Sequence, residues 1–274
     1  MSAFDLNLHP FDEAIALERL ADGNFQGHTS ARYANMVGPF GGIVAAQMLQ
    51  AVLLHPARLG DPTVLTINFA TGLQDGPFEV SARPARTNRS TQHWQLEIKQ
   101  NGESALIGTA MTAVRRPTWS DTEHRMPSTI GPQEVARNVP SVPMEWVKRY
   151  DMRFIKGALP AVWDGRLEPD SLSQQWMRDD PPRPLDFCAL AALADVFFIR
   201  LFSRRATRSP VGTVSMTVYF HADAAQLALT GTGFLLGQAV GQQFRDGYFD
   251  QSAQLWNEAG DLLATTSQLV YFRD

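Results

Sequence analysis

The chain has 274 residues, of which 44% are hydrophobic and 19% are charged. This composition is typical of a globular protein and excludes a largely disordered chain, while the length allows two compact units. The net charge of −4 provides no broad positive field, so we expect neither a nucleic acid nor a membrane surface as partner. The single cysteine, Cys188, excludes an intrachain disulfide and a multi-thiolate metal site.

The start of the chain does not place a basic stretch before an apolar one, so we expect no secretory signal. The longest apolar stretch, 187–202, contains Asp195 and Arg200, and it is shorter than the ~20 apolar residues that a membrane span needs. These observations predict a cytoplasmic protein in which that stretch is a buried helix.

The first half of the chain is predicted to form one buried helix followed by four strands. Residues 41–55 begin with Gly41 and Gly42 and are apolar around most of a helical circumference, which is typical of a helix enclosed by other structure. The alternating runs that follow are separated by turn residues, including the hairpin dipeptide Asn101-Gly102. The predicted strands are 63–71, 78–87, 91–100 and 105–115.

The second half repeats this plan after a proline-rich, non-periodic segment. We interpret residues 119–144 as a linker between an N-terminal unit, 1–118, and a C-terminal unit, 145–274. The predicted helix of the second unit is 185–203, and its predicted strands are 152–156, 172–178, 213–221, 227–237, 249–256 and 262–273. Self-similarity over half the chain indicates a duplicated unit, and a helix laid against a curved antiparallel sheet is an α+β arrangement.

Asp195 is the most unexpected residue, because it lies in the run FCALAALADVFFIRLF with apolar or small residues on both sides. A buried carboxylate either finds hydrogen-bonding partners or bears a large desolvation cost. One interpretation is that Asp195 lies on a narrow polar edge of the helix that reaches solvent. The other is that it lines a polar pocket and holds a water as a general base.

Two downstream residues are candidate partners for such a carboxylate. Thr213 opens the run TVSMTVYFH, and Gln268 lies in the final run LLATTSQLVYFR. Each is also an ordinary strand residue, so neither indicates a site by itself. Strict alternation raises a further difficulty, because it places Thr213 on the polar face of its strand with Ser215 and Thr217. A β-bulge near Thr213 would bring it to the other face.

Taken together, Asp195, Thr213 and Gln268 resemble the active site of the acyl-CoA thioesterase II family, whose members have a tandem (double) hot-dog fold. The resemblance covers nearly the whole chain in order. It implies one hydrolytic site in the C-terminal unit, in which these three side chains orient the attacking water. The candidate substrate-binding residues are Phe40, Gly41, Gly42, Arg89, Ser90 and Trp176, although close packing also explains the glycines and core packing explains Phe40 and Trp176.

Comparison of the two halves places Met111 opposite Gln268 and Gln50 opposite Asp195, so the first half lacks these polar groups. The sequence has no GxSxG motif, and no histidine is placed to activate Cys188, which favours direct hydrolysis over an acyl-enzyme. We therefore expect an acyl-CoA thioesterase without a cofactor or metal. The alternatives are a non-catalytic acyl-ligand binder and a hot-dog hydratase or dehydratase. Free sheet edges also allow a homodimer or larger homo-oligomer.

Overall fold

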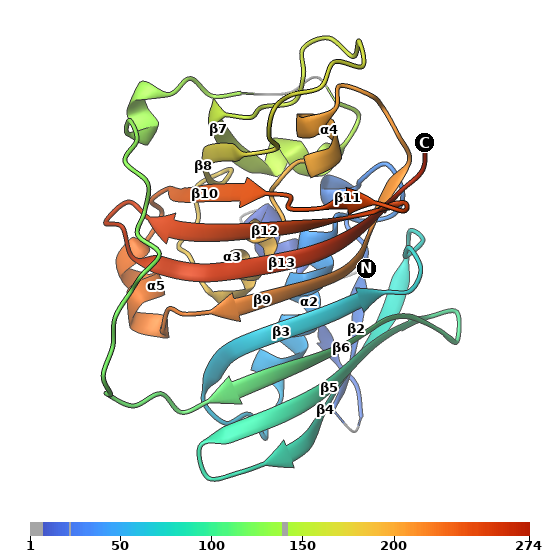
Figure 1. Cartoon of the computed structure of the whole chain (residues 1–274). Coiled ribbons are helices and arrows are strands. Elements are labelled where there is room, and N and C mark those ends of the chain that lie inside the picture. The colour runs from blue at the N-terminus through green and yellow to red at the C-terminus, as the bar shows by residue number, and fades with distance from the viewer. Residues whose placement is uncertain (1–7, 22, 139–141) are drawn as a thin grey trace.

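The computed structural model describes residues 8–21, 23–138 and 142–274, so the first seven residues and part of the predicted linker lie outside the described residues. Within these ranges thirteen strands form one antiparallel sheet, which curves around the helices behind it (Figure 1). The strands are β1 (Glu18–Arg19), β2 (Asn24–His28), β3 (Asp61–Phe69), β4 (Pro77–Thr87), β5 (Thr91–Gln100), β6 (Glu103–Ala113), β7 (Tyr150–Lys156), β8 (Ser173–Asp179), β9 (Val211–Phe220), β10 (Leu235–Val240), β11 (Phe244–Arg245), β12 (Tyr248–Asn257) and β13 (Leu262–Phe272).

Two of the helices, α2 and α3, lie behind the sheet near its centre (Figure 1). The helices are α1 (Pro10–Ala14), α2 (Gly41–Leu54), α3 (Phe187–Leu193), α4 (Arg200–Arg204) and α5 (Ala224–Thr230), with short 3-10 turns at Ala31–Tyr33, Pro132–Glu134 and Glu145–Arg149. Most side chains of α2 and all of those of α3 are buried, because each helix is apolar around its circumference. None of the helices in the described ranges is long and apolar enough to cross a membrane.

The order of strands in the sheet shows the duplication directly. In the first half the order is β2-β4-β5-β6-β3, and in the second half it is β8-β10-β12-β13-β9, which is the same permutation. The main helix follows the first strand of each set, and β3 and β9 pair antiparallel where the two halves meet. Thr66 pairs with Thr217 at the centre of this ladder, so the two halves are related by an approximate twofold axis there.

The strands predicted in the first half are confirmed within a few residues. The β5–β6 hairpin turns at Asn101 and Gly102, which have φ angles of 54° and 84°, as a two-residue hairpin turn requires. Along β5 the side chains of Gln92, Trp94 and two further apolar residues are buried at every second position. This alternation covers α2 with one face of the sheet and leaves the other face polar.

Two predictions in the second half are wrong. The helix expected over 185–203 is broken into α3 and α4, and the residues between them are not helical. The first residues of the strand expected over 227–237 belong to helix α5 instead. This helix is stabilised by a capping box, in which the Asp223 side chain accepts from the Gln226 N–H and the Gln226 side chain accepts from the Asp223 N–H. The elements before residue 40, α1, β1 and β2, were not predicted because their runs are too short to show periodicity.

Residues 114–138, which follow β6, cross the outer face of the second half-sheet (Figure 1). They are fixed there by two buried tryptophans of the sheet. Trp176 on β8 donates its indole N–H to the carbonyl of Ile130 over 2.9 Å, and Trp256 on β12 donates to the carbonyl of His124 over 3.2 Å. This segment therefore covers the apolar outer surface of strands β8, β10 and β12.

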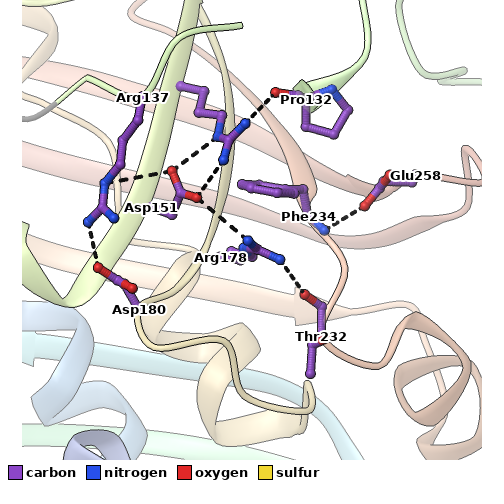
Figure 2. Close-up of polar contacts among 9 residues, drawn as sticks. Pro132, Arg137, Asp151, Arg178, Asp180, Thr232, Phe234 and Glu258 are labelled. Carbon is purple, nitrogen blue, oxygen red and sulfur yellow. Dashed lines mark hydrogen bonds and ion pairs between the residues drawn. The ribbon is translucent and has the colours of Figure 1, made fainter. Parts of the chain in front are cut away.

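A buried carboxylate on β7 ties the same segment down (Figure 2). Asp151 accepts two hydrogen bonds from Arg153, at 3.1 and 2.9 Å, and lies 3.9 Å from Arg137. Arg153 also donates to the carbonyl of Pro132 over 2.7 Å. Arg178 completes the cluster, 3.7 Å from Asp151, with its guanidinium over the Phe234 ring. The cluster lies on the face of β7 opposite to Tyr150, so it stabilises the fold without reaching the interior.

Candidate active site

Asp195 lies just beyond the end of α3, at the start of a non-helical segment, 194–199. The last turn tightens, since the Asp195 N–H bonds to Ala192 and the Val196 N–H bonds to Leu193, each three residues back. The chain then turns out of the helix, and the Phe197 N–H bonds to the Asp195 carbonyl over 2.8 Å. Asp195 is therefore placed by a helix end, and the prediction that it lies within a continuous helix is wrong.

Side chains from neighbouring elements satisfy the carbonyl groups that the broken helix leaves without partners. Gln175 on β8 donates to the carbonyl of Val196, and Arg200 at the start of α4 donates to the carbonyl of Phe198. Buried carbonyls without such partners would cost about 1–3 kcal/mol each. These two side chains thus make the break stable inside the protein.

Gln268 brings the C-terminal strand into contact with Asp195. Its side-chain N–H₂ donates to Asp195 Oδ1 over 2.7 Å, across 73 residues of sequence. Gln268 lies on the inner face of β13 and is only 6% exposed. The structure therefore joins two of the three residues that the sequence singled out.

The start of α2 lies against the same carboxylate. A Cβ atom at Gly41 would lie 2.8 Å from Asp195 Oδ2, and one at Gly42 would lie 2.6 Å from the Ala192 carbonyl. Both glycines are therefore required for the close approach of α2 to the end of α3. Phe40, the N-cap residue, provides no side-chain cap, so the first N–H groups of α2 are available to the carboxylate.

Burial raises the pKa of Asp195 to about 7, because the surroundings disfavour the ionised form. The Gln268 amide and the Gly42 N–H oppose this effect, since both interact with the carboxylate. The residue is half-buried, so its side chain still meets solvent-accessible space. A carboxyl group with a pKa near neutrality is suited to accept and return a proton.

Thr213 faces the same side of the sheet as Gln268 because of a β-bulge. Thr213 pairs with Val270, and Ser215 pairs with Leu269, so Val214 is the extra residue. Val270 is buried on the inner face two residues after Gln268, and a cross-strand partner shares its face. The bulge that the alternation pattern required is therefore present. Thr213 lies two residue pairs along the β9–β13 ladder from Gln268, at the next pair that faces inward.

The candidate substrate-binding residues separate into two groups. Phe40 precedes Gly41, which approaches Asp195, and the Phe40 ring stacks on Trp146 with ring centroids 4.4 Å apart. Trp176 points to the opposite face of the sheet, under the segment that contains Ile130. The structure does not bring Trp176 to Asp195.

Arg89 and Ser90 are also distant from Asp195. They are exposed in the turn between β4 and β5, and the neighbouring Thr91 pairs with Ala113, which pairs with Asp61 at the start of β3. The ring of Phe69, at the other end of β3, is the one that approaches Gly41. A strand of this length separates its ends by roughly 25 Å.

The first half contains a reduced counterpart of the site. The Cys188 thiol, near the start of α3, donates to the side-chain oxygen of Gln50 on α2 over 3.3 Å. This contact is the approximate twofold mate of the approach of Gly42 to Asp195, as the comparison of the halves predicted. The prediction for the last strand is one residue off: Gln268 pairs with Met216, and the pair at the equivalent place joins Leu65 to Ala110, not to Met111.

The site contains no histidine. A hydratase would need a histidine beside an acidic residue, but His221 follows the end of β9 and contacts Thr265, several residues along the strand from the partner of Gln268. In the described ranges no three His, Cys, Asp or Glu side chains gather where they could hold a metal ion. The groups that the structure places against the Asp195 carboxyl group are the Gln268 amide and the Gly42 N–H.

Two helices enclosed by a continuous sheet, with a carboxylate of one unit at the helix start of the other, define a double hot-dog protein. The chain belongs to the acyl-CoA thioesterase family: residues 30–114 match the model of the acyl-CoA thioesterase N-terminal domain, and residues 121–272 match that of the C-terminal domain. These matches confirm the resemblance that the sequence suggested.

Solved structures have the same fold. A conserved protein of unknown function with a hot dog fold from Alicyclobacillus acidocaldarius is 47% identical, with a TM-score of 0.92 over 97% of this chain and 99% of that one. A putative thioesterase II from Thermobifida fusca has 18% identity and a TM-score of 0.81, covering 98% and 99%. The acyl-CoA thioesterase II TesB2 of Mycobacterium marinum has 18% identity and a TM-score of 0.74, covering 96% and 98%. A comparison with curated proteins gives no match.

Proposed function

We propose that this protein hydrolyses an acyl-CoA thioester to the free acid and coenzyme A by direct attack of a water held by Asp195, Thr213 and Gln268. The observation that carries the proposal is the carboxyl group of Asp195, held by Gln268 over 2.7 Å at the start of α2, with a pKa raised to about 7. A base with this pKa removes a proton from water at neutral pH and can return it in a later step.

The proposed reaction assigns a role to each of these groups. The water oxygen forms a bond to the thioester carbon while the Asp195 carboxylate takes the proton. The carbonyl oxygen gains negative charge, and the N–H groups at the start of α2 can donate to it. The carbon–sulfur bond then breaks, the thiolate leaves with the bonding electrons, and Asp195 returns the proton to it. Gln268 and Thr213 hold the water in line for attack.

Thiol release from acyl-CoAs of two to sixteen carbons tests the proposal. We expect release by the parent protein, and a loss of about 100-fold or more in Asp195→Asn, because general base catalysis typically contributes that much. Asp246→Asn is the matched control, since Asp246 is exposed at a positive φ angle that asparagine also adopts. Full activity of Asp195→Asn would refute the proposed mechanism.

The same assay separates the alternatives. Saturable binding of an acyl-CoA without thiol release would indicate an acyl-ligand binder, and hydration of an enoyl-CoA would indicate a hydratase. A cytoplasmic location and a homo-oligomeric state stay predictions, to be checked by fractionation of cells and by light scattering of the purified protein.

A further inference from the structure

Arg200 is a buried cation without an anionic partner. Its side chain is 0% exposed, and in the described ranges no carboxylate lies within ion-pair distance of it. All its acceptors are neutral: the carbonyls of Phe198, Ser171 and Ala239, the Ser173 hydroxyl at 2.7 Å, and the Gln251 side-chain oxygen at 3.0 Å. Burying a guanidinium in this way is costly, so its place in the fold requires an explanation.

Two of these contacts lead to Asp195. The carbonyl of Phe198 belongs to the segment 194–199 that begins beside Asp195, so Arg200 fixes the chain three residues beyond the carboxylate. Gln251 on β12 lies directly opposite Gln268 in the ladder with β13. Both glutamines are buried, at 3% and 6% exposure, and cross-strand partners share one face of the sheet with Cβ atoms about 5 Å apart.

The end groups determine how both amides are oriented. Arginine has only donors, so Gln251 must present its oxygen to Arg200 and its N–H₂ group away from it. A carboxylate has only acceptors, so Gln268 must present its N–H₂ group to Asp195 and its oxygen away from it. In the described ranges no direct hydrogen bond joins the N–H₂ group of Gln251 to the oxygen of Gln268, so a bridging water would link the two amides across the ladder.

We propose that Arg200 and Gln251 are positioning residues that hold Gln268 in the orientation in which it donates to Asp195. Each residue of the series Arg200, Gln251, Gln268 and Asp195 then donates a hydrogen bond toward the next one. Without Arg200 and Gln251, the Gln268 amide can turn over and present its oxygen to Asp195, which favours the protonated form of the carboxyl group. This inference rests on the proposed function for its role in catalysis, but the orientation itself can be measured without turnover.

The test is a Gln251→Met variant, which keeps the volume and removes both polar groups. With the protein labelled with ¹³C at aspartate carboxyl carbons, we expect the Asp195 titration to move upward by about half a pH unit or more. We also expect kcat with an acyl-CoA to fall about tenfold near neutral pH, with KM changed less than threefold, as the loss of one hydrogen bond implies. The carboxyl resonance of Asp195 is identified as the one that is missing from the spectrum of the Asp195→Asn variant.

Other ionisable groups do not obscure this titration. Helix α2 and strand β13 carry no charged side chain, and Asp151 and Arg153 of β7 pair on the opposite face. Burial raises the pKa of Tyr150 well above its ordinary value, so it stays protonated throughout. Burial also raises the pKa of Asp179 to about 7, and its resonance serves as an internal reference that should not move.

Two further variants keep the outcome decisive. Gln251→Glu retains an acceptor for Arg200 and loses the donor, so it should fold and move the Asp195 titration further upward. Gln254→Met, on the opposite face of β12, should change nothing. An unchanged Asp195 titration in both Gln251 variants overturns the inference, even if kcat falls, because lost packing alone gives that result. If the parent releases no thiol but the titration moves, the proposed function fails and the positioning role stands.

Discussion

Replacing Asp195 by asparagine should make the protein more stable at pH 8 while it removes activity. The folded-state pKa of about 7 exceeds the ordinary value of 3.8, so the folded protein binds this proton more tightly than the unfolded chain does. Stability is therefore lost as the pH rises from about 4 to about 7, and the full cost is present above pH 7. Asparagine never ionises, so the variant does not bear this cost.

The size of the effect follows from two opposing contributions. A shift of about 3 pH units corresponds to about 4 kcal/mol, as an upper bound for a half-buried group. Asparagine has one acceptor oxygen where aspartate has two, so either the Gln268 N–H or the Gly42 N–H loses its partner, at about 1–2 kcal/mol. The net gain at pH 8 is about 2 kcal/mol, or roughly 5 °C in Tm for a chain of this size.

Urea unfolding of parent and variant between pH 4 and pH 9 measures this difference. We expect the variant to be no more stable than the parent near pH 4 and to gain stability progressively up to pH 8. Asp246→Asn, with its exposed side chain, should follow the parent at every pH. Parallel stability curves for parent and Asp195→Asn would show that Asp195 ionises without cost, and the burial argument would then be wrong.

Two further substitutions and one thiol reaction probe the surroundings of the site. Gly42→Ala should lower stability by about 1–3 kcal/mol, because the Cβ atom would lie 2.6 Å from a backbone carbonyl, whereas Gly131→Ala, with 3.5 Å to its nearest neighbour, should be close to neutral in thermal unfolding. Thr213→Val should lower kcat about tenfold without lowering Tm, and Ser215→Ala on the outer face should leave both unchanged. Cys188 should not react with a thiol reagent in the folded protein, since it is buried and burial raises the pKa of its thiol, and unfolding should release one reactive thiol per chain.

The sequence alone predicts an element correctly where its local conformational preference and its pattern of apolar residues indicate the same structure. Helix α2 and the β5–β6 hairpin were predicted within a few residues, because an all-round apolar run and an Asn-Gly turn each allow few alternatives. The pairing of Gln268 with Asp195 came from a resemblance between whole chains. Nothing in the local pattern around either residue predicts a contact across 73 residues of sequence.

Tertiary contacts decided the features that local patterns could not show. The bulge at Val214 exists because Thr213 and Met216 both face inward, and a three-residue offset between inward positions requires one extra residue. Strict alternation assigns Thr213 to the wrong face for this reason. Alternation along one strand cannot show an extra residue such as Val214, because a β-bulge is defined by the pairing with the neighbouring strand.

The break between α3 and α4 explains why two charged residues lie in one apolar run. In a continuous buried helix, Asp195 and Arg200 would each need partners on a surface that offers only apolar side chains. At a break they meet free backbone groups instead: Arg200 donates to the carbonyl of Phe198, and Asp195 is reached by Gln268 and by the start of α2. A carboxylate and a guanidinium five residues apart in an otherwise apolar segment therefore indicate a break in the helix rather than one continuous buried helix. The same break that ends the helix places the carboxyl group within reach of Gln268 and of the start of α2.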